Sequence, residues 1–293
     1  MEDRYGLLEE LRITVLIEDY AGYDSGLLGQ HGTSILLEAS AGQSQNTILF
    51  DTGQTAEPVL HNMKLLGKDP AGIDMIVLSH CHFDHTGGLI GILGAGGFAR
   101  IPVIAHPSIY RANFSLKPKL RSVGMDPESS REAVANKGGE LILTEEPLPL
   151  MSGVVTSGEI RERAGFEQTP TLSLLTVKNG KMVPDLMADD LSLTFILPRG
   201  LVIVTGCSHA GIIGIVNTAT RLTGVEHIAA VIGGFHLIDA DQERINRTVD
   251  ELMAVNPDQV FTGHCTGLKA EAKMLERFGD RFRKLHTGMK ITL

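Results

Sequence analysis

The sequence has few cysteines, no long apolar run and an excess of acidic over basic side chains. Its three cysteines, Cys81, Cys207 and Cys265, are odd in number and far apart, which argues against a disulfide framework. No apolar run reaches the roughly 18 residues of a membrane-spanning helix. Because 35 acidic residues outnumber 26 basic ones, for a formal net charge of -9, we expect neither a nucleic acid nor an anionic membrane as partner.

The amino-terminal segment also lacks the features of a signal peptide. It is acidic at the front and contains no small-residue cleavage site, so a cytoplasmic protein is expected. Of the 293 residues 43% are hydrophobic, which is ample for a buried core.

The densest group of polar residues follows a short apolar run. The segment Ile73–Leu89 reads IDMIVLSHCHFDHTGGL, and its first residues suit a strand buried on both faces. Four potential metal ligands follow it: His80, His82, Asp84 and His85. Taken singly, each is commonly a satisfied polar residue or a cap, but residues two apart in extended chain point the same way. Three imidazoles beside a carboxylate therefore predict a site for Zn, Fe or Mn rather than Ca or Mg.

Histidines recur at three further predicted strand ends. Each follows a short apolar segment and a glycine-rich turn; they are His209, His236 and His264. In layered α/β folds the ends of successive strands lie along one rim, so these histidines and the first group are candidates for a single site. Cysteines lie beside the histidines, and we interpret Cys81 and Cys265 as small buried side chains.

Three other polar residues could serve either the site or the fold. Asp51 ends a predicted strand and either closes the turn or accepts a hydrogen bond from a ligand histidine. His106 precedes a proline, which is more typical of a structural residue. His31 lies in a Gly-rich connection, and its role stays open.

Residues 108–187 are predicted to be the least regular part of the chain. Within them, the basic and aromatic stretch 110–121 includes Arg111 and Lys117 in an otherwise acidic protein. Such a stretch is commonly a solvated face, but it could also attract an anionic substrate. We therefore predict one domain, 1–293, in which an insertion at about 108–187 forms a substrate lid.

With these residues assembled, the sequence resembles the metallo-β-lactamase superfamily over nearly its whole length. The matching segments are HGTSILLE, ILFDTG, LSHCHFDHTGGL, SGEIRERAGFE, GLVIVTGCSHAG, GGFHL and TGHCTG. More narrowly, TGCSHAG with TGHCTG is similar to a subgroup labelled 7,8-dihydropterin-6-ylmethyl-4-(β-D-ribofuranosyl)aminobenzene-5'-phosphate synthase. The resemblance implies an α/β fold, namely an αββα sandwich of two mixed β-sheets with outer helices and a metal site at the sheet edge.

The resemblance also implies a set of ligands for one or two divalent metal ions, Zn above all, with Fe or Mn as alternatives. The first ion would be held by His80 and His82, and the second by Asp84, His85 and His264. No histidine occurs between His106 and His209, so His209 is expected to supply the imidazole that the superfamily usually draws from that region. Cys207 stands where many members place a bridging aspartate and is a further candidate ligand.

Three functions follow from these ligands. The first is a hydrolase in which metal-activated hydroxide attacks an ester or phosphoester of a small, anionic substrate, with Asp84 and His236 as catalytic residues. The second is a transferase of the subgroup's type, in which the metal acts as a Lewis acid on a pyrophosphate leaving group. The third is a metal-binding sensor or redox protein without hydrolytic turnover.

Overall fold

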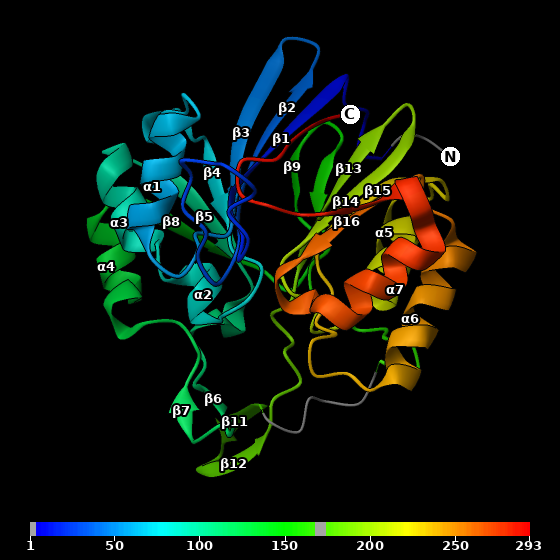
Figure 1. Ribbon diagram of the computed structural model, residues 1–293. Coiled ribbons are helices and arrows are strands. Elements are labelled where there is room, and N and C mark those ends of the chain that lie inside the picture. The colour runs from blue at the N-terminus through cyan, green and yellow to red at the C-terminus, as the bar shows by residue number, and fades with distance from the viewer. Residues whose placement is uncertain (1–3, 168–173) are drawn as a thin grey trace.

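Two seven-stranded sheets pack face to face, and helices cover both outer faces (Figure 1). The computed structural model describes residues 4–167 and 174–293. Within these ranges the αββα sandwich expected from the resemblance is present, and no helix is long and apolar enough to cross a membrane.

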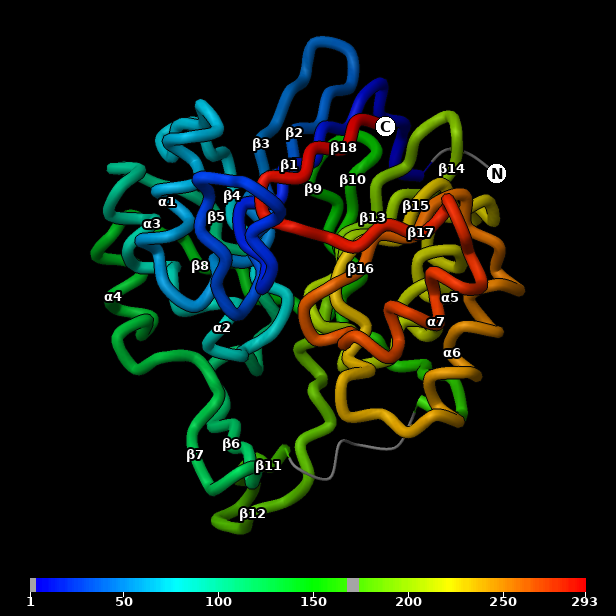
Figure 2. Tube along the Cα trace, viewed as in Figure 1, coloured from blue at the N-terminus to red at the C-terminus, as the bar shows by residue number. Residues whose placement is uncertain are grey.

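The first sheet is built from the amino-terminal half of the chain and its last strand. In spatial order its strands are β18 (Lys290–Thr292), β1 (Glu10–Ile17), β2 (Ser34–Ala41), β3 (Ser44–Phe50), β4 (Met75–Val77), β5 (Ile101–Ala105) and β8 (Gly139–Leu143). Strands β1 to β3 pair antiparallel, whereas β3, β4, β5 and β8 pair parallel. Figure 2 shows the carboxyl-terminal strand β18 beside β1, so the two ends of the chain share one sheet edge.

The second sheet belongs mainly to the carboxyl-terminal half. Its strands, in spatial order, are β17 (Phe282–Lys284), β16 (Gln259–Gly263), β15 (Ile228–Gly234), β14 (Gly200–Thr205), β13 (Ser192–Leu197), β10 (Val154–Thr156) and β9 (Pro149–Met151). Strands β14 to β17 run parallel. Because both sheets contain parallel strands, each has a rim at which several carboxyl-terminal strand ends lie side by side.

The helices lie on the side of the sheet to which their own strands belong (Figure 1). The first sheet is covered by α1 (Ala56–Leu65), α2 (Phe83–Thr86), α3 (Leu89–Gly96) and α4 (Arg131–Asn136), and the second by α5 (Ile212–Thr223), α6 (Gln242–Val255) and α7 (Leu268–Phe278). Local signals set their ends. Asp241 caps α6 by accepting a hydrogen bond from the Arg244 amide at 2.8 Å, and α5 is followed by Gly224, whose backbone lies in the left-handed region.

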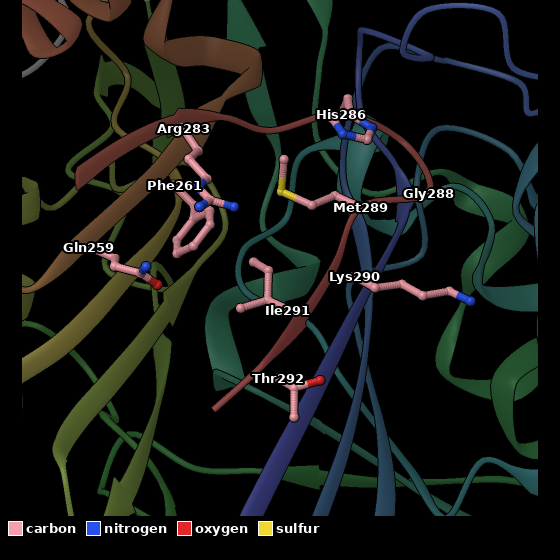
Figure 3. A pocket seen from close by; sticks show the side chains of 9 residues that line it. All are labelled: Gln259, Phe261, Arg283, His286, Gly288, Met289, Lys290, Ile291 and Thr292. Atoms are coloured by element: carbon pink, nitrogen blue, oxygen red, sulfur yellow. The ribbon is translucent and has the colours of Figure 1, made fainter. Parts of the chain in front are cut away.

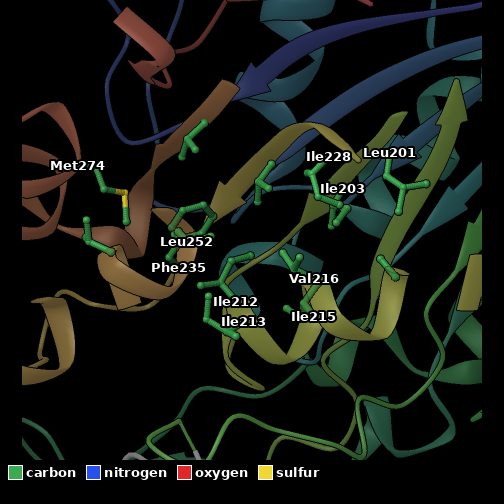
Figure 4. Close-up of a cluster of buried hydrophobic side chains, with 14 of the residues drawn as sticks. Leu201, Ile203, Ile212, Ile213, Ile215, Val216, Ile228, Phe235, Leu252 and Met274 are labelled. Atoms are coloured by element: carbon green, nitrogen blue, oxygen red, sulfur yellow. The ribbon is translucent and has the colours of Figure 1, made fainter. Parts of the chain in front are cut away.

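Three apolar layers hold the sandwich together. One lies between the sheets and includes Phe50, Phe195 and Phe261, while the other two lie between each sheet and its helices. Figure 4 shows the layer under α5, α6 and α7, where Ile203 and Phe235 pack among aliphatic side chains. Full burial of one such side chain is worth about 1.5–3 kcal/mol.

The segment 108–187 is more regular than its sequence indicates. Strand β8 belongs to the first sheet, and β9 and β10 belong to the second. Four further strands of the segment form a small sheet, set apart from the sandwich in Figure 1, in the order β12 (Lys181–Pro184), β11 (Leu174–Lys178), β6 (Asn113–Ser115) and β7 (Arg121–Ser122). Strands of two to five residues are too short to show a clear alternation of apolar and polar side chains, so the sequence does not predict this sheet.

The hairpin β2–β3 has a tight connection. Strand β2 extends to Ala41, and β3 begins at Ser44. Gly42 adopts a φ of 59°, which lets a two-residue connection reverse the chain.

Candidate metal centre

Polar side chains from both sheets meet at the rim where the parallel strands end. The segment after β4 carries His80 and His82 and continues into α2, which carries Asp84 and His85. On the second sheet, the segments after β14, β15 and β16 carry His209, His236 and His264, respectively. On the second sheet the three strands end at or beside glycines, Gly206, Gly234 and Gly263, so the polar side chains that follow can face the neighbouring strand end rather than the core.

Three imidazoles form the first group. The ring centroid of His80 lies 4.7 Å from that of His82 and 4.8 Å from that of His209. Ser79 Oγ donates its only hydrogen to Asp51 Oδ2 at 2.7 Å, so at 2.8 Å from His80 Nδ1 it must accept from that nitrogen, which leaves Nε2 of His80 as an acceptor. In the described part of the chain, buried His80 Nε2 and His209 Nδ1 have no hydrogen-bond partner.

These imidazoles are held in their neutral form. Burial, together with the neighbouring imidazoles, lowers the pKa of His80 and of His209 well below its usual range. For His82, burial lowers the pKa to about 4. Neutral imidazoles with free lone pairs are the form in which histidine binds a metal ion.

Asp84 lies at the centre of the second group. Its Oδ2 atom is 3.5 Å from His85 Nε2 and 3.3 Å from His264 Nε2, and His31 Nε2 is 3.5 Å away on the exposed side. Burial opposes the ionisation of Asp84, but the imidazoles of His85 and His264 outweigh it and hold the pKa of this carboxyl well below its usual range. The carboxylate is therefore charged at neutral pH.

The thiol of Cys207 lies between the two groups. His85 Nε2 is 3.1 Å from Cys207 Sγ. Within 4.8 Å of one another lie ligand atoms of two overlapping sets, His80, Cys207 and His209 in one and His85, Cys207 and His264 in the other. A single sulfur atom is thus placed to contribute to both sets.

Two carboxylates orient histidines of the cluster from behind. The Nδ1–H of His85 donates to Asp51 Oδ2 at 2.7 Å, and that of His264 donates to Asp19 Oδ1 at 2.8 Å. Two interpretations of Asp51 were possible, and in the structure it accepts a hydrogen bond from the candidate ligand His85.

The sequence alone did not indicate Asp19, and it left the role of His31 open. Asp19 could have been found because it follows the end of β1 as the other site residues follow theirs.

His236 and Cys265 extend the cluster on the side of the second sheet. The ring centroids of His236 and His209 are 4.1 Å apart, and ligand atoms of Cys207, His236 and Cys265 lie within 4.8 Å of one another. Cys265 is buried, as predicted, and its sulfur lies beside the cluster. Cys81, in contrast, packs in the apolar layer between the first sheet and its helices, as expected.

The backbone around the cluster is tightly constrained. Asp51, Ser208, His236 and His264 all adopt positive φ angles, of 60°, 55°, 45° and 49°, respectively. A Cβ atom at Gly206 would come within 2.2 Å of Ser79 Oγ. The glycine there allows the two sheets to approach closely enough for their histidines to meet.

A cavity of about 260 Å³ opens onto the cluster. One wall contains His82, Asp84, Cys207, His236 and His264, and the opposite wall belongs to the small sheet and its loop, with Ser115, Lys117 and Arg121. The guanidinium of Arg121 lies 5.7 Å from the ring centroid of Phe83, at the start of α2. The small sheet therefore supplies two cations to a pocket whose other wall is rich in imidazole.

Arg111 does not take part in this basic wall, contrary to our interpretation of the stretch 110–121. Its Nε–H donates to Asp185 Oδ2 at 2.7 Å, and its Nη1 lies 2.6 Å from Asp189 Oδ2. Because both carboxylates neutralise the guanidinium, Arg111 is a structural cation. His106 is buried outside the cluster, as predicted, and its Nδ1 lies 2.7 Å from Ser108 Oγ.

A second cavity lies away from the candidate ligands, between the start of β16 and strand β18 (Figure 3). Its walls include Phe261, Arg283, His286, Met289 and Ile291. Among the residues that the structure describes, this cavity is lined by one imidazole and by no thiol or carboxylate, so its walls lack a set of metal ligands.

The residues of the rim fit a borderline divalent metal ion. Neutral imidazoles with unpartnered nitrogens, a thiol and an ionised carboxylate match the nitrogen and sulfur ligands that zinc prefers. Backing carboxylates on His85 and His264 are the usual partners of metal-binding histidines.

Comparison with known proteins identifies the family to which the chain belongs. The family model described as the metallo-beta-lactamase superfamily matches residues 29–171. A Methanocaldococcus jannaschii protein named 7,8-dihydropterin-6-methyl-4-(beta-D-ribofuranosyl)-aminobenzene-5'-phosphate synthase is 44% identical and is covered over 97% of each chain. An uncharacterised protein of the same organism is 33% identical over 84% of this chain and 87% of its own.

Among solved structures, that of Tm1679, described as a metal-dependent hydrolase of the beta-lactamase superfamily, has a TM-score of 0.78 and 26% identity. The match covers 96% of this chain and 98% of that one. With a near full-length relative, a matching family model and a shared fold, the chain belongs to the metallo-β-lactamase superfamily.

Proposed function

We propose that this chain is a metal-dependent enzyme that joins a dihydropterin-6-ylmethyl group to the amine of an aminobenzene that carries a ribosyl 5'-phosphate. The observation that carries the proposal is the pocket itself, where candidate metal ligands face the cations of the small sheet. Supporting it, the relative named for this synthesis is 44% identical over 97% of both chains. The small sheet takes the role of the substrate lid.

The metal ligands that we assign come from both sheets. One ion would be held by His80, His82, His209 and Cys207, and a second by Asp84, His85, His264 and Cys207. The donor types favour zinc. When bound, such an ion supplies Lewis-acid stabilisation of the negative charge that develops on a departing pyrophosphate.

The protein's own side chains would position two anionic substrates. Lys117 and Arg121 are the cations of the pocket wall, and both suit a phosphate group because guanidinium and ammonium donors form strong charge-assisted hydrogen bonds with it. The rest of the acidic surface would repel phosphate, so these two residues favour entry at one place.

The reaction that we propose forms a bond between carbon and nitrogen. The amine nitrogen attacks the methylene carbon of the pterin, the bond from that carbon to the pyrophosphate oxygen breaks, and the nitrogen loses one proton. We assign acceptance of this proton to His236, which lines the pocket. Asp84, held between His85 and His264, keeps the site geometry fixed as the charge moves.

Reversal of both pocket charges, with Lys117→Glu and Arg121→Glu together, is expected to raise the KM for the phosphorylated amine roughly 10- to 100-fold. Solvent screening at these exposed side chains reduces each charge-assisted contact to about 1 kcal/mol, and each 1.4 kcal/mol is tenfold in affinity. Steady-state kinetics would measure it, with zinc content as a check. Lys119→Glu, in the same loop but outside the pocket lining, is the matched control. An equal rise in the control would attribute the effect to net charge alone.

A second candidate is a hydrolase, favoured by the likeness to Tm1679 at 26% identity. One experiment separates the two. The zinc-loaded protein is given dihydropterin-6-ylmethyl pyrophosphate with and without the aminobenzene ribosyl phosphate, and pyrophosphate release is followed. Release that needs the amine supports the synthase, and release without it supports a hydrolase. No release, with generic esters, phosphodiesters and lactones also unchanged, would contradict both and favour a non-hydrolytic metal-binding protein.

A further inference from the structure

The imidazole of His82 is hydrogen-bonded to a residue of the small sheet. Its Nε2 lies 3.2 Å from Oδ1 of Asn113, the first residue of β6. Asn113 is completely buried, so no solvent competes for this contact. The ring of a candidate metal ligand is thus fixed by an amide that belongs to the lid rather than to the sandwich.

The orientation of this amide is set by a carboxylate. Asn113 Nδ2 donates to Asp185 Oδ2 at 2.6 Å, and the same oxygen accepts from Arg111 Nε at 2.7 Å. An ionised carboxylate only accepts hydrogen bonds, so the NH₂ group of Asn113 must face Asp185. Its carbonyl oxygen then faces His82, and an amide oxygen only accepts.

The tautomer of His82 follows from this chain of donors and acceptors. Because Asn113 offers an acceptor, the proton of the neutral imidazole lies on Nε2, and the lone pair lies on Nδ1. His82 Nδ1 is 3.2 Å from His209 Nε2, inside the ligand cluster. The nitrogen that can bind a metal ion therefore points at the site.

The same network also holds the backbone beside His82. Arg111 Nη1 lies 2.6 Å from Asp189 Oδ2, and that oxygen accepts a hydrogen bond from the Cys81 amide at 2.8 Å. Contacts therefore run from the Cys81 backbone through Asp189, Arg111, Asp185 and Asn113 to the side chain of the next residue along the chain. A shift of the Cys81 backbone would therefore be transmitted through these contacts to the His82 side chain.

We propose that Asn113 and Asp185 are positioning residues for His82 and that they couple the small sheet to the metal centre. Asn113 begins β6, and Asp185 directly follows β12, so both sit where the small sheet joins the rest of the molecule. A displacement of that sheet would withdraw the acceptor from His82 Nε2 and release the ring. This inference concerns metal binding and does not depend on which reaction the site catalyses.

Asp185→Asn tests the coupling without touching His82. An amide at 185 can accept as well as donate, so Asn113 can turn over and present its NH₂ group to Nε2. We expect the zinc affinity to fall about 10- to 100-fold, as for other residues that orient a metal-binding histidine. Asn113→Leu, which removes the acceptor, should do the same. Chelator competition measures the affinity, and circular dichroism confirms folding.

The matched control is Thr176→Val. Thr176 pairs with Asn113 in the small sheet and donates to the Ala112 carbonyl at 2.8 Å, so its loss perturbs the same strands without entering the network. Zinc affinity equal to that of the unsubstituted protein is expected. A loss as large as in Asp185→Asn would overturn the proposal by attributing the effect to sheet packing.

Long-range ¹H–¹⁵N spectra of imidazole in the zinc-loaded protein provide a second readout. The proposal predicts a proton on His82 Nε2 and zinc on Nδ1 in the unsubstituted protein, and loss of this pattern in Asp185→Asn. A proton on Nδ1 in the unsubstituted protein would overturn it, and so would unchanged zinc affinity in both variants. No substrate is used, so failure here is distinct from failure of the proposed synthase.

Discussion

Replacement of Cys207 by alanine is expected to lower both the metal content and the activity, the latter by about 1,000-fold. Its sulfur belongs to both sets of ligand atoms, one with His80 and His209 and the other with His85 and His264. Loss of one shared ligand therefore weakens both positions. Metal-ion catalysis contributes several kcal/mol, and each 1.36 kcal/mol is tenfold in rate. Elemental analysis and steady-state kinetics would measure the two effects.

Cys81→Ala is the matched control for this experiment. Cys81 is also a buried thiol and immediately follows His80, but it packs in the apolar layer under the first sheet. A small loss of stability with unchanged metal content is expected. If Cys207→Ala retained the same metal per chain as Cys81→Ala, the thiol would not be a ligand, and the two sets would have to be completed by other residues.

The second large effect concerns stability and Asp190. This carboxyl is completely buried; Oδ2 accepts from the Ala210 amide at 2.7 Å, and Oδ1 has no partner in the described part of the chain. Burial raises its pKa from 3.8 to about 7. Because the folded protein binds the proton more tightly than the unfolded chain, the contribution to stability is present at low pH and is lost as pH rises from about 4 through 7.

Asp190→Asn removes this titration while keeping an oxygen for the Ala210 amide. At pH 8 the variant is expected to be more stable by up to about 4 kcal/mol, since each pKa unit corresponds to 1.36 kcal/mol. At pH 4 the two proteins should be nearly equal. Urea unfolding with a chelator present measures both without a contribution from metal. A difference that is independent of pH would show that Asp190 is not the titrating group.

Much of this rim could be predicted from local patterns. Short apolar runs followed by a histidine locate β4, β14, β15 and β16, the last three with glycine at the strand end, and parallel strand ends meet at one edge. The spacing of His80 and His82 indicates a shared direction without any knowledge of the fold. The family resemblance rests on motifs in which strand, turn and ligand are adjacent in sequence, and the sandwich was expected from that resemblance alone.

The remaining contacts depend on pairs that are far apart in sequence. Asp19 meets His264 across 245 positions, and Asn113 meets Asp185 across 72. No local periodicity indicates which carboxylate will face which imidazole. The same limit explains Arg111, whose charge counts toward a basic stretch in the sequence but is neutralised by Asp185 and Asp189 in the fold.

The positive φ angles at the rim imply a trade-off between thermal stability and function. Asp51, Ser208, His236 and His264 are not glycines, and a left-handed backbone costs such residues about 1–2 kcal/mol each. The surrounding contacts, including those of Asp51 with Ser79 and His85, hold the chain in these conformations. A selection for thermal stability alone would therefore be expected to relax this rim first, and the resulting variants would outlast the natural protein while losing the alignment of its ligands.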